Sequence, residues 1–420
     1  MEKILRSTEK LIPKKIYRFF QPAYHYLLTL TGAIIYGFPS RKLFIIGVTG
    51  TKGKSSTVEI INKILEDAGH KTALSNTIRF KIGNESKANM YKMSMPGRFF
   101  MQKFIHDAVK AGCTHAVVEI TSEGYLQYRN KFIDMNICVF TNLAPEHIER
   151  HGSYENYRDA KVGIASEILN SKKTNRTIVV NADDKEAKHF LQIPAENHVT
   201  FSLKDVEAFH EDKTGIKFLY QKELWNSPLI GKFNAYNILA GIRVAEEIGI
   251  KQEIIKKSIS EFNHIAGRAE KIKSDRPFEV IVDYAHTPDS LIALYDAFDH
   301  AKKKICVLGN TGGGRDTWKR PEMAKIADNY CDHIILTNED PYDEDPRKIV
   351  DEMKVSIKNK PVEIIMNRRE AIAKAISLAK EGDAVLITGK GTDPYIMEAN
   401  GTKIPWSDAK IAEEELKKML

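Results

Sequence analysis

A glycine- and lysine-rich stretch, GVTGTKGKSST at residues 47–57, directly follows an apolar run. Its glycines allow successive backbone N–H groups to point into one concavity, and a helix that starts behind the loop adds its positive N-terminus. Lys54 stands where a lysine meets the outer phosphates of a nucleotide, and Ser55 or Ser56 is placed to hold Mg²⁺. The loop therefore predicts binding of ATP or a close relative.

The residues around this loop alternate between strand and helix patterns. Apolar side chains recur at helical spacing over Ser55–Ala68, and Gly69 is a natural stop. Further apolar runs end in polar residues, as strands of open parallel sheets do at their ligand-binding edge; they lie at 115–120, 136–143 and 177–184. A second alternating series follows residue 265, with apolar runs that begin near 278, 303, 332, 362 and 383.

Together these patterns predict an α/β fold with more than one sheet domain. We expect a central P-loop ATPase-like parallel-sheet domain at residues 43–265, a C-terminal Rossmann-like doubly wound domain at 266–420, and a short helical segment at 1–42. A length of 420 residues agrees, because it is too long for one ordinary core.

The cysteines and the charge narrow the class of protein. The four cysteines are far apart and lack metal-binding spacing; they are Cys113, Cys138, Cys306 and Cys331. No cleavable signal peptide is apparent, so we expect reduced thiols in a cytoplasmic protein. Of the net charge of +7, residues 1–42 carry +6, from eight basic against two acidic residues. The rest of the chain carries only +1, which argues against a nucleic-acid partner.

The basic N-terminal segment contains a long uncharged stretch. From Phe19 to Ser40 there is no Asp, Glu, Lys or Arg, and basic residues flank both ends. A membrane span would be just long enough but expensive, because the stretch includes glutamine, proline, histidine, threonine and glycine. A helix lying on the anionic inner surface of the membrane is cheaper. A helix packed on the central domain or on a dimer partner has the same pattern, so both interpretations stay open.

A set of motifs in fixed order resembles a known family. The chain carries GVTGTKGKSS, VEITSEGYLQYR, TNLAPEHIERHGSYENYRDAK, NADD, GKFNAYN, GRAE, DYAHTPDSL and GKGTDP, in this order. The order resembles that of the Mur ligases, and most closely the branch that adds the third residue of the peptidoglycan stem. The resemblance covers roughly residues 43–420. Full-length relatives carry an N-terminal domain for the UDP moiety, and we expect this chain to lack it, because about 42 residues are too few.

The resemblance implies an ATP-dependent, ADP-forming amide ligase of peptidoglycan precursor synthesis. ATP gives its γ-phosphate to a carboxylate of a UDP-muramoyl dipeptide, and the amine of an amino acid attacks the acyl phosphate. Such a reaction concentrates negative charge and needs metal ions and cations. The resemblance assigns ATP contacts to Gly50, Thr51, Lys52, Gly53, Lys54, Ser55, Ser56, Asn234, Asn237, Arg268 and Asp283, and substrate contacts to Ser94, Thr141, Asn142, Asp340, Tyr342, Gly389 and Asp393.

The resemblance also implies a metal and catalytic set. Lys54 is catalytic, and Ser55, Glu119, His147 and Lys161 are metal ligands, the last three being catalytic as well. Lys161 lies fourteen positions after His147, which is the family's spacing for a lysine carbamylated by CO₂. An ammonium beside Mg²⁺ would be repelled, whereas a carbamate is an anionic oxygen ligand.

The pocket for the incoming amino acid departs from the family pattern. Members that select meso-diaminopimelate carry Asp-Asn-Pro-Arg, whose arginine pairs with the distal carboxylate. Here Asp340 and Tyr342 occupy the Asn and Arg positions, and Thr392 and Asp393 replace a His-Glu pair. With Asp343 nearby, we expect an acidic pocket suited to a side-chain ammonium, which favours L-lysine over meso-diaminopimelate.

Two alternatives stay open. Folylpolyglutamate and cyanophycin synthetases share the loop and join a different carboxylate to a different amino acid. The second alternative is a non-catalytic ATP-binding scaffold, against which Glu119, His147 and Lys161 argue jointly, since a scaffold needs no second metal. We expect ATP, Mg²⁺ and a carbamylated Lys161 as cofactors, small-molecule substrates, no nucleic acid, and a peripheral membrane contact through residues 1–42 as an open option.

Overall fold

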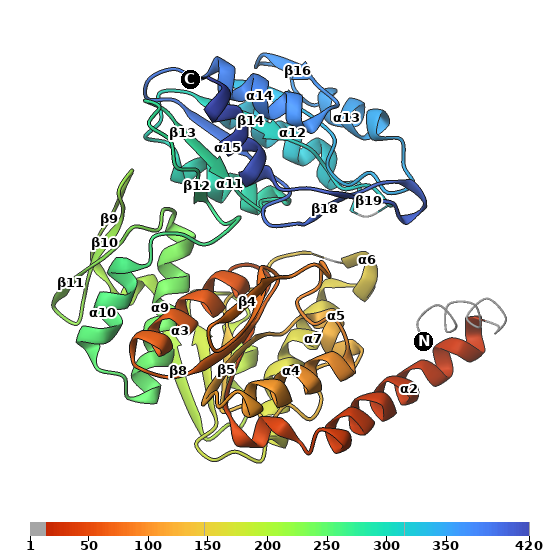
Figure 1. Ribbon diagram of the computed structural model, residues 1–420, viewed down its shortest axis with the longest axis vertical. Coiled ribbons are helices and arrows are strands. Elements are labelled where there is room, and N and C mark those ends of the chain that lie inside the picture. The colour runs from red at the N-terminus through yellow and green to blue at the C-terminus, as the bar shows by residue number, and fades with distance from the viewer. Residues whose placement is uncertain (1–13, 147, 315, 420) are drawn as a thin grey trace. The chain divides into compact units, whose positions relative to one another are not determined.

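The structure is a computed structural model, and it describes residues 14–146, 148–314 and 316–419 (Figure 1). The chain forms two compact units. The first runs to Phe201 and includes Ala240–Ile250; the second comprises Ser202–Leu239 and the chain from Lys251 onward.

The first unit is built on an eight-stranded sheet, counted over the described residues, in the order β4-β3-β2-β5-β1-β6-β7-β8. β1 is central and pairs in parallel with β5 and β6, with Val48 opposite Glu119. The carboxyl ends of these strands therefore meet at one edge, where open parallel sheets bind their ligands. The strands are β1 (Phe44–Thr49), β2 (Thr72–Ser75), β3 (Arg79–Ile82), β4 (Glu85–Ala88), β5 (His115–Glu119), β6 (Ile137–Phe140), β7 (Thr177–Asn181) and β8 (Asn197–Phe201).

Helices cover both faces of this sheet. α4, α7 and α8 share one apolar core with alternate residues of β1, β5, β6 and β7, as the period of two in a strand requires. α3 packs on β1, β2 and β5 with a different set of side chains, and the Cβ position of Gly241 in α9 lies against Ile60 of α3. The helices are α2 (Lys14–Ile35), η1 (Pro39–Lys42), α3 (Lys54–Asp67), α4 (Arg98–Lys110), α5 (Ser122–Leu126), α6 (Ile148–His151), α7 (Tyr154–Ser166), η2 (Glu167–Asn170), α8 (Ala187–Leu191) and α9 (Lys232–Ile248), which begins in the second unit.

The second unit contains a doubly wound sheet in the order β12-β13-β17-β14-β15-β16, parallel except at β12. One face packs against α11, α12 and α13, and the other against α14 and α15. The elements are β12 (Glu270–Lys271), β13 (Glu279–Val282), α11 (Pro288–Ala297), β14 (Lys304–Leu308), α12 (Lys319–Tyr330), β15 (His333–Leu336), α13 (Pro346–Lys354), β16 (Val362–Ile364), α14 (Arg368–Leu378), β17 (Ala384–Ile387), β18 (Tyr395–Met397), η4 (Ala399–Gly401), β19 (Lys403–Pro405) and α15 (Asp408–Lys418).

The predicted α/β architecture is confirmed, with two mainly parallel sheets in which, among the described strands, only the pairings of β3, β4 and β12 are antiparallel, and the helix behind the loop is α3. Sequence reasoning missed a small antiparallel sheet in the order β11-β10-β9. Its edge strand β9 is exposed or half-buried throughout, so it lacks the apolar run by which buried strands are found. This sheet comprises β9 (Glu207–Asp212), β10 (Gly215–Tyr220) and β11 (Glu223–Ser227); η3 (Leu203–Asp205) precedes it and α10 (Gln252–Glu261) follows it.

The N-terminal segment is helical, as predicted, over Lys14–Ile35. Across the residues that are described, no helix combines the length and apolar character needed to cross a bilayer. One face of α2 is nonetheless buried in the first unit. Thr29 Oγ1 donates to the carbonyl of Tyr128 at 3.0 Å, and the Tyr26 ring packs against those of Tyr128 and Phe132.

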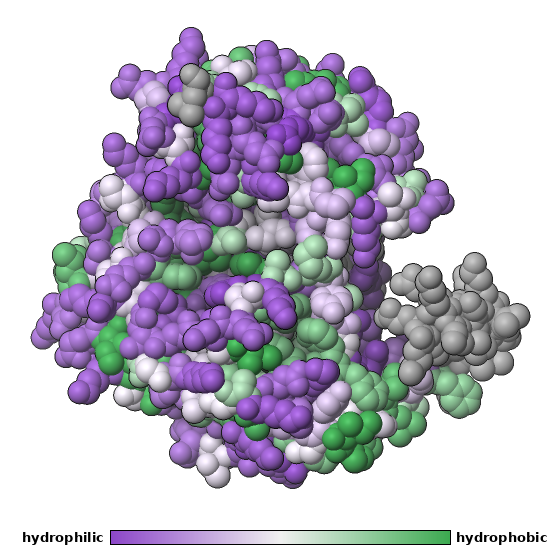
Figure 2. All heavy atoms as spheres, viewed as in Figure 1, coloured by the Kyte–Doolittle hydropathy of each residue, from purple (hydrophilic) through white to green (hydrophobic). Residues whose placement is uncertain are grey.

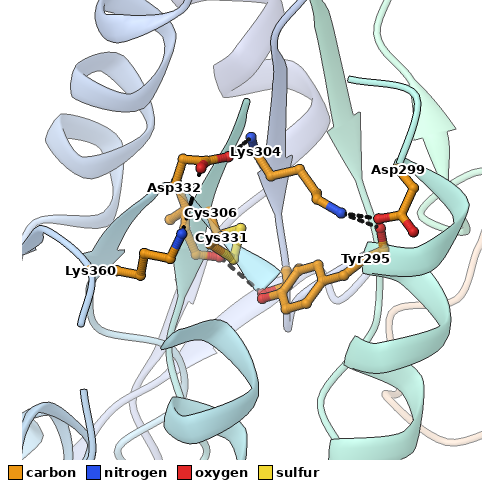
Figure 3. Close-up of a disulfide and its surroundings, with 9 residues drawn as sticks. Tyr295, Asp299, Lys304, Cys306, Cys331, Asp332 and Lys360 are labelled. Atoms are coloured by element: carbon orange, nitrogen blue, oxygen red, sulfur yellow. Dashed lines mark hydrogen bonds and ion pairs between the residues drawn. A yellow bond between two sulfur atoms is a disulfide. The ribbon is translucent and has the colours of Figure 1, made fainter. Parts of the chain in front are cut away.

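The expectation of four reduced cysteines is wrong for two of them. Cys306 in β14 and Cys331, just before β15, form a disulfide with a Cα–Cα distance of 6.1 Å (Figure 3). Adjacent parallel strands bring the two residues together although 25 positions separate them in the sequence. Asp332 beside the disulfide accepts a hydrogen bond from the backbone N–H of Lys304. Cys113 and Cys138 are free and buried.

Candidate active site

The loop between β1 and α3 is held by the segment that follows β6. The N–H of Thr51 donates to the carbonyl of Asn142 at 2.8 Å, and the N–H of Lys52 donates to Asn142 Oδ1 at 2.9 Å. Thr141 Oγ1 donates to the carbonyl of Lys52 at 2.7 Å. Gly50 has φ +145°, and a Cβ there would lie 1.9 Å from Thr141 Oγ1, so only glycine fits. The backbone of the loop is therefore preorganised before any nucleotide binds.

Lys54 and Ser55 begin α3 directly behind the loop, after Gly53 in a left-handed conformation with φ 78°. Lys54 Nζ donates to the carbonyl of Thr51 at 2.8 Å, so its ammonium lies over the loop. Ser56 is buried in the same turn. This arrangement places a cation and a helix N-terminus at one point, which suits the phosphates of a nucleotide.

Glu119, at the end of β5, is a buried carboxylate beside this loop. Ser55 Oγ donates to its Oε2 at 2.7 Å, and Ser94 Oγ donates to its Oε1 at 2.8 Å. Burial by itself would raise the pKa of Glu119, but the Lys54 ammonium and the hydrogen bonds from Ser55, Ser94 and Thr77 outweigh it and lower the pKa on balance. Glu119 is therefore an anionic oxygen donor, the type of ligand that Mg²⁺ prefers.

Lys161 reaches the same loop from α7. Its side chain is only 2% exposed, and Nζ donates to the carbonyl of Gly50 at 2.7 Å. Burial, and then the nearby Lys54 ammonium, lower the pKa of Lys161 well below its ordinary value, against the opposing effect of Glu146 and Glu119. Such a lysine holds a larger fraction of neutral amine than an exposed one.

Lys52 and Glu146 form an ion pair. Lys52 Nζ lies 3.0 Å from Glu146 Oε1, and the two side chains are 30% and 5% exposed. The Lys52 ammonium is therefore already paired within the protein.

His147, the remaining predicted metal ligand, lies outside the described residues. Within the described part of the chain, no group of three or more His, Cys, Asp and Glu side chains forms a metal site. The predicted set of Ser55, Glu119 and Lys161 differs from such a group, because only Glu119 belongs to these four residue types. Ser55 would bind a metal through its hydroxyl and Lys161 through a carbamate. Their oxygen-rich surroundings at the loop fit Mg²⁺ held together with phosphate oxygens.

The second unit holds the other predicted nucleotide contacts. Asn234 Nδ2 donates to the carbonyl of Ile230 at 2.7 Å, and Asn237 Nδ2 donates to Asn234 Oδ1 at 3.0 Å. The guanidinium of Arg268 lies 4.4 Å from the centre of the Tyr284 ring. Burial raises the pKa of Asp283, which accepts from the N–H groups of Ala269 and Ala285, both at 2.6 Å. Their roles toward a nucleotide stay predictions.

The predicted acidic pocket contains a buried lysine. Lys390 Nζ, on a side chain with no exposure, lies 2.7 Å from Asp340 Oδ1 and 3.5 Å from Asp393 Oδ2. Asp343 is exposed and accepts from the N–H of Asn400. The predicted acidic pocket therefore holds an internal ammonium that already faces two of its three carboxylates, Asp340 and Asp393.

Tyr342 and Gly389 lie in the same region. Tyr342 has φ 53°, and its N–H donates to the carbonyl of Met397. Gly389 has φ +103°, and a Cβ there would lie 2.3 Å from Oε2 of the buried Glu339. Glycine is therefore required at position 389 by packing alone, whatever its role toward substrate.

Sequence reasoning missed two residues of the first site. Thr77 donates its N–H to Glu119 Oε2 at 3.1 Å, and the polar residues after β2 were a signal of the kind used for other strands. The hydroxyls of Tyr157 and Thr51 lie 3.0 Å apart. Tyr157 stands four positions before Lys161, on the same face of α7, so helical spacing was the signal that could have found it.

Comparisons with known proteins agree with this geometry. The Mur ligase middle domain matches residues 48–245, and the Mur ligase glutamate ligase domain matches residues 267–391. The UDP-N-acetylmuramoyl-L-alanyl-D-glutamate–2,6-diaminopimelate ligase of Halalkalibacterium halodurans is 37% identical over 91% of this chain and 80% of its own length. The enzyme of the same name from Aquifex aeolicus is 36% identical over 98% of this chain and 82% of its own length.

A solved structure of a ligase with this name has a TM-score of 0.63 at 30% identity, covering 90% of this chain and 79% of that one. Fold and loop thus define the class, an ATP-dependent, ADP-forming ligase. The chain belongs to the Mur ligase family. Members of this family use ATP, generally with Mg²⁺.

Proposed function

We propose that the chain joins a diamino acid to UDP-N-acetylmuramoyl-L-alanyl-D-glutamate, with ATP converted to ADP and phosphate. The γ-phosphate passes to a substrate carboxylate, the amine attacks the resulting acyl phosphate at its carbonyl carbon, and phosphate leaves as the amide forms. Support for the substrate pair comes from relatives of this name that are 33–37% identical. The observation that carries the chemistry is the meeting of Lys54, Ser55 and Glu119 at one preorganised loop.

The residues of the first site have distinct proposed tasks. The backbone of Gly50–Gly53 cradles the phosphates, and the Lys54 ammonium neutralises charge that develops as the γ-phosphate transfers. Ser55 and Glu119 would hold Mg²⁺, which would supply positive charge to screen the phosphate oxygens. Ser94, which donates to Glu119, keeps that carboxylate oriented. His147 joins them by the family's motif alone.

We further propose that Lys161 is carbamylated. The neutral amine adds to the carbon of CO₂, forming an N–C bond and releasing one proton, which leaves a carbamate anion. The lowered pKa of Lys161 supports this reaction, because only the unprotonated amine reacts. The ammonium's 2.7 Å bond to Gly50 O would be exchanged for anionic oxygens facing the metal site.

For the incoming amino acid, we place meso-diaminopimelate first and L-lysine second. The relatives are named for diaminopimelate, and the internal pairing of Asp340 and Asp393 with Lys390 weakens the case for a pocket that seeks an ammonium. Lysine stays a candidate because Tyr342, not arginine, stands where the family's diaminopimelate enzymes bind the distal carboxylate.

The test is ADP release with UDP-N-acetylmuramoyl-L-alanyl-D-glutamate and a panel of amino acids, with mass spectrometry of the product. We expect an amide product with meso-diaminopimelate or L-lysine, and little with D-lysine or L-glutamate. Product formed only from a folate and glutamate would move the chain to the folylpolyglutamate alternative. ATP binding without turnover on any pair would identify a scaffold.

We propose a cytoplasmic location, because nucleotide-linked substrates and ATP are available there. The domain limits 43–265 and 266–420 also stay proposals. The two compact units place the β9–β11 sheet and α10 with the second unit, while the family's middle domain matches through residue 245. Limited proteolysis, with mass spectrometry of the stable fragments, would choose between these boundaries.

A further inference from the structure

The exposed face of α2 is apolar, which is unusual for a helix on a protein surface. Leu27, Ile34 and Ile35 are 59%, 60% and 62% exposed, and Tyr24 is 41% exposed. At 100° per residue these side chains and Thr31 fall within an arc of about 100°. We call this set, Tyr24, Leu27, Thr31, Ile34 and Ile35, the outer stripe. Figure 2 shows hydrophobic surface where Figure 1 places α2.

The opposite face of α2 holds the helix in place. His25, Thr29, Gly32 and Ala33 are buried, and they fall on the side opposite the outer stripe. The Cβ position of Gly32 lies 3.5 Å from the Phe99 ring of α4. The packing of this buried face therefore fixes the rotation of the helix about its axis, and this rotation exposes the outer stripe.

The polar groups of the outer stripe need little water. Thr31 Oγ1 donates to the carbonyl of Leu27 at 2.8 Å, inside the helix. The phenol of Tyr24 has the amphipathic character that suits the depth of lipid headgroups. An ordinary surface helix would carry charges here, whereas no Asp, Glu, Lys or Arg occurs from Phe19 to Ser40.

The charge around the stripe selects the partner. Residues 1–42 carry a net charge of +6, and Lys14, Lys15 and Arg18 precede the stripe while Arg41 and Lys42 follow it. Arg41 pairs with Asp134, but Lys42 is exposed. A basic segment with an apolar stripe attracts an anionic lipid surface, where the apolar side chains enter the acyl boundary. A second copy of the chain would carry the same positive charge in this segment, so the two segments would repel each other.

We propose that the outer stripe of α2 docks this protein on anionic membranes as a peripheral helix lying flat. The inference is independent of which amino acid the enzyme adds. It places the ligase next to the membrane that consumes peptidoglycan precursors, without a span through the bilayer.

The test is co-flotation of the full-length protein with vesicles of phosphatidylcholine alone and of phosphatidylcholine with 30% phosphatidylglycerol. We expect at least about tenfold stronger partition to the anionic vesicles at low salt, falling as salt rises. Leu27→Ser combined with Ile34→Ser should lower partition by about a hundredfold, since each removes roughly tenfold. ADP release in solution should be unchanged in this variant.

Matched controls separate the stripe from general hydrophobicity and charge. Leu224→Ser with Val355→Ser removes side chains that are 59% and 69% exposed elsewhere, and this variant should partition like the wild type. Lys14, Lys15 and Arg18 changed to Gln should weaken anionic binding at least tenfold, whereas Gln at the exposed Lys213, Lys251 and Lys358 should have a smaller effect.

Two results would overturn the proposal. The first is that the wild type stays out of the anionic vesicle fraction at low salt. The second is that the Leu27→Ser, Ile34→Ser variant floats as well as the wild type. Sedimentation equilibrium on the same proteins identifies the alternative, because a dimer that this variant abolishes, without vesicle binding, would make the stripe a contact between two copies.

Discussion

Lys52 and Lys54 lie two positions apart in the same loop, yet the structure predicts opposite outcomes when each is replaced. Lys52→Asn removes an ammonium that is paired with Glu146, and we expect it to be tolerated. Lys54→Ala should lose ATP turnover. The pair is its own matched control, because both changes remove one cation from the same loop.

The magnitude follows from where the two ammonium groups lie. Lys52 Nζ is 3.0 Å from Glu146, and at an effective dielectric constant of 20 the bare attraction is about 5 kcal/mol. The 30% exposed Lys52 side chain is screened by water and loses hydration on pairing, so the net value is about 1 kcal/mol. The loop backbone keeps its bonds to Asn142 in either case. Lys52→Asn should therefore lower kcat/KM for ATP by no more than about fivefold.

Lys54, by contrast, is expected to act directly on the phosphates. Its ammonium lies on the loop at Thr51 O and is close enough to lower the pKa values of both Glu119 and Lys161. Removing a cation that meets developing phosphate charge costs about 3–4 kcal/mol, a loss of a hundredfold to a thousandfold.

The assay is ADP release as a function of ATP, at fixed muramoyl dipeptide and amino acid, for both single variants. Glu146→Gln and the Lys52→Asn, Glu146→Gln double variant complete a cycle, in which we expect a coupling energy of about 1 kcal/mol. Equal losses from Lys52→Asn and Lys54→Ala would refute the reasoning and show that Lys52 also acts on phosphate. Additive effects in the cycle would show that the ion pair contributes nothing in solution.

Three further outcomes are expected. Lys161→Ala should abolish ligation, and short-chain carboxylic acids should partly restore it by supplying the missing carboxylate; full activity without added acid would reject Lys161 as a metal ligand. Burial, with Arg98 and Arg129 nearby, lowers the pKa of His25 to about 4. Between about pH 4 and 6.5 the unfolded chain therefore binds more protons than the folded protein, so the free energy of unfolding falls as the pH drops through this window. Because neither ring nitrogen of His25 has a hydrogen-bond partner among the described residues, His25→Leu should raise the free energy of unfolding, measured by urea titration, by about 1 kcal/mol at pH 7 and by more at pH 5; a lower free energy of unfolding at both pH values would contradict this. Cys306→Ala with Cys331→Ala should destabilise the second unit by about 3 kcal/mol, because the bond closes a 25-residue separation, and alkylation after unfolding should count two thiols without reductant and four with it; four in both would show that the bond is absent.

The sequence by itself determined those parts of the protein that depend on neighbouring residues. The glycines, the helix start and the lysine of residues 47–57 are all local features, so the sequence predicted the use of ATP, which the family confirms; the contacts of this loop with the nucleotide stay predictions. Apolar runs long enough to be buried on both faces predicted β1, β5, β6 and β7 in the first unit and β13 to β17 in the second, but not the parallel strands β2 and β8. The polar edge strand β9 was not predicted, because it is held by backbone pairing with β10 and has no apolar pattern.

Only the tertiary structure decided which distant residues meet. Strand order brings Glu119 to Ser55 across 64 positions and Lys161 to Gly50 across 111, and burial at that meeting point lowers the pKa of Lys161. The fold also places Lys390 between Asp340, fifty positions away, and Asp393, three positions away. The sequence alone had predicted an acidic pocket there, because it does not show that Lys390 faces these carboxylates. The rotation of α2 was set in the same way. Packing against α4 and against Tyr128 and Phe132 determined which side chains of α2 face outward.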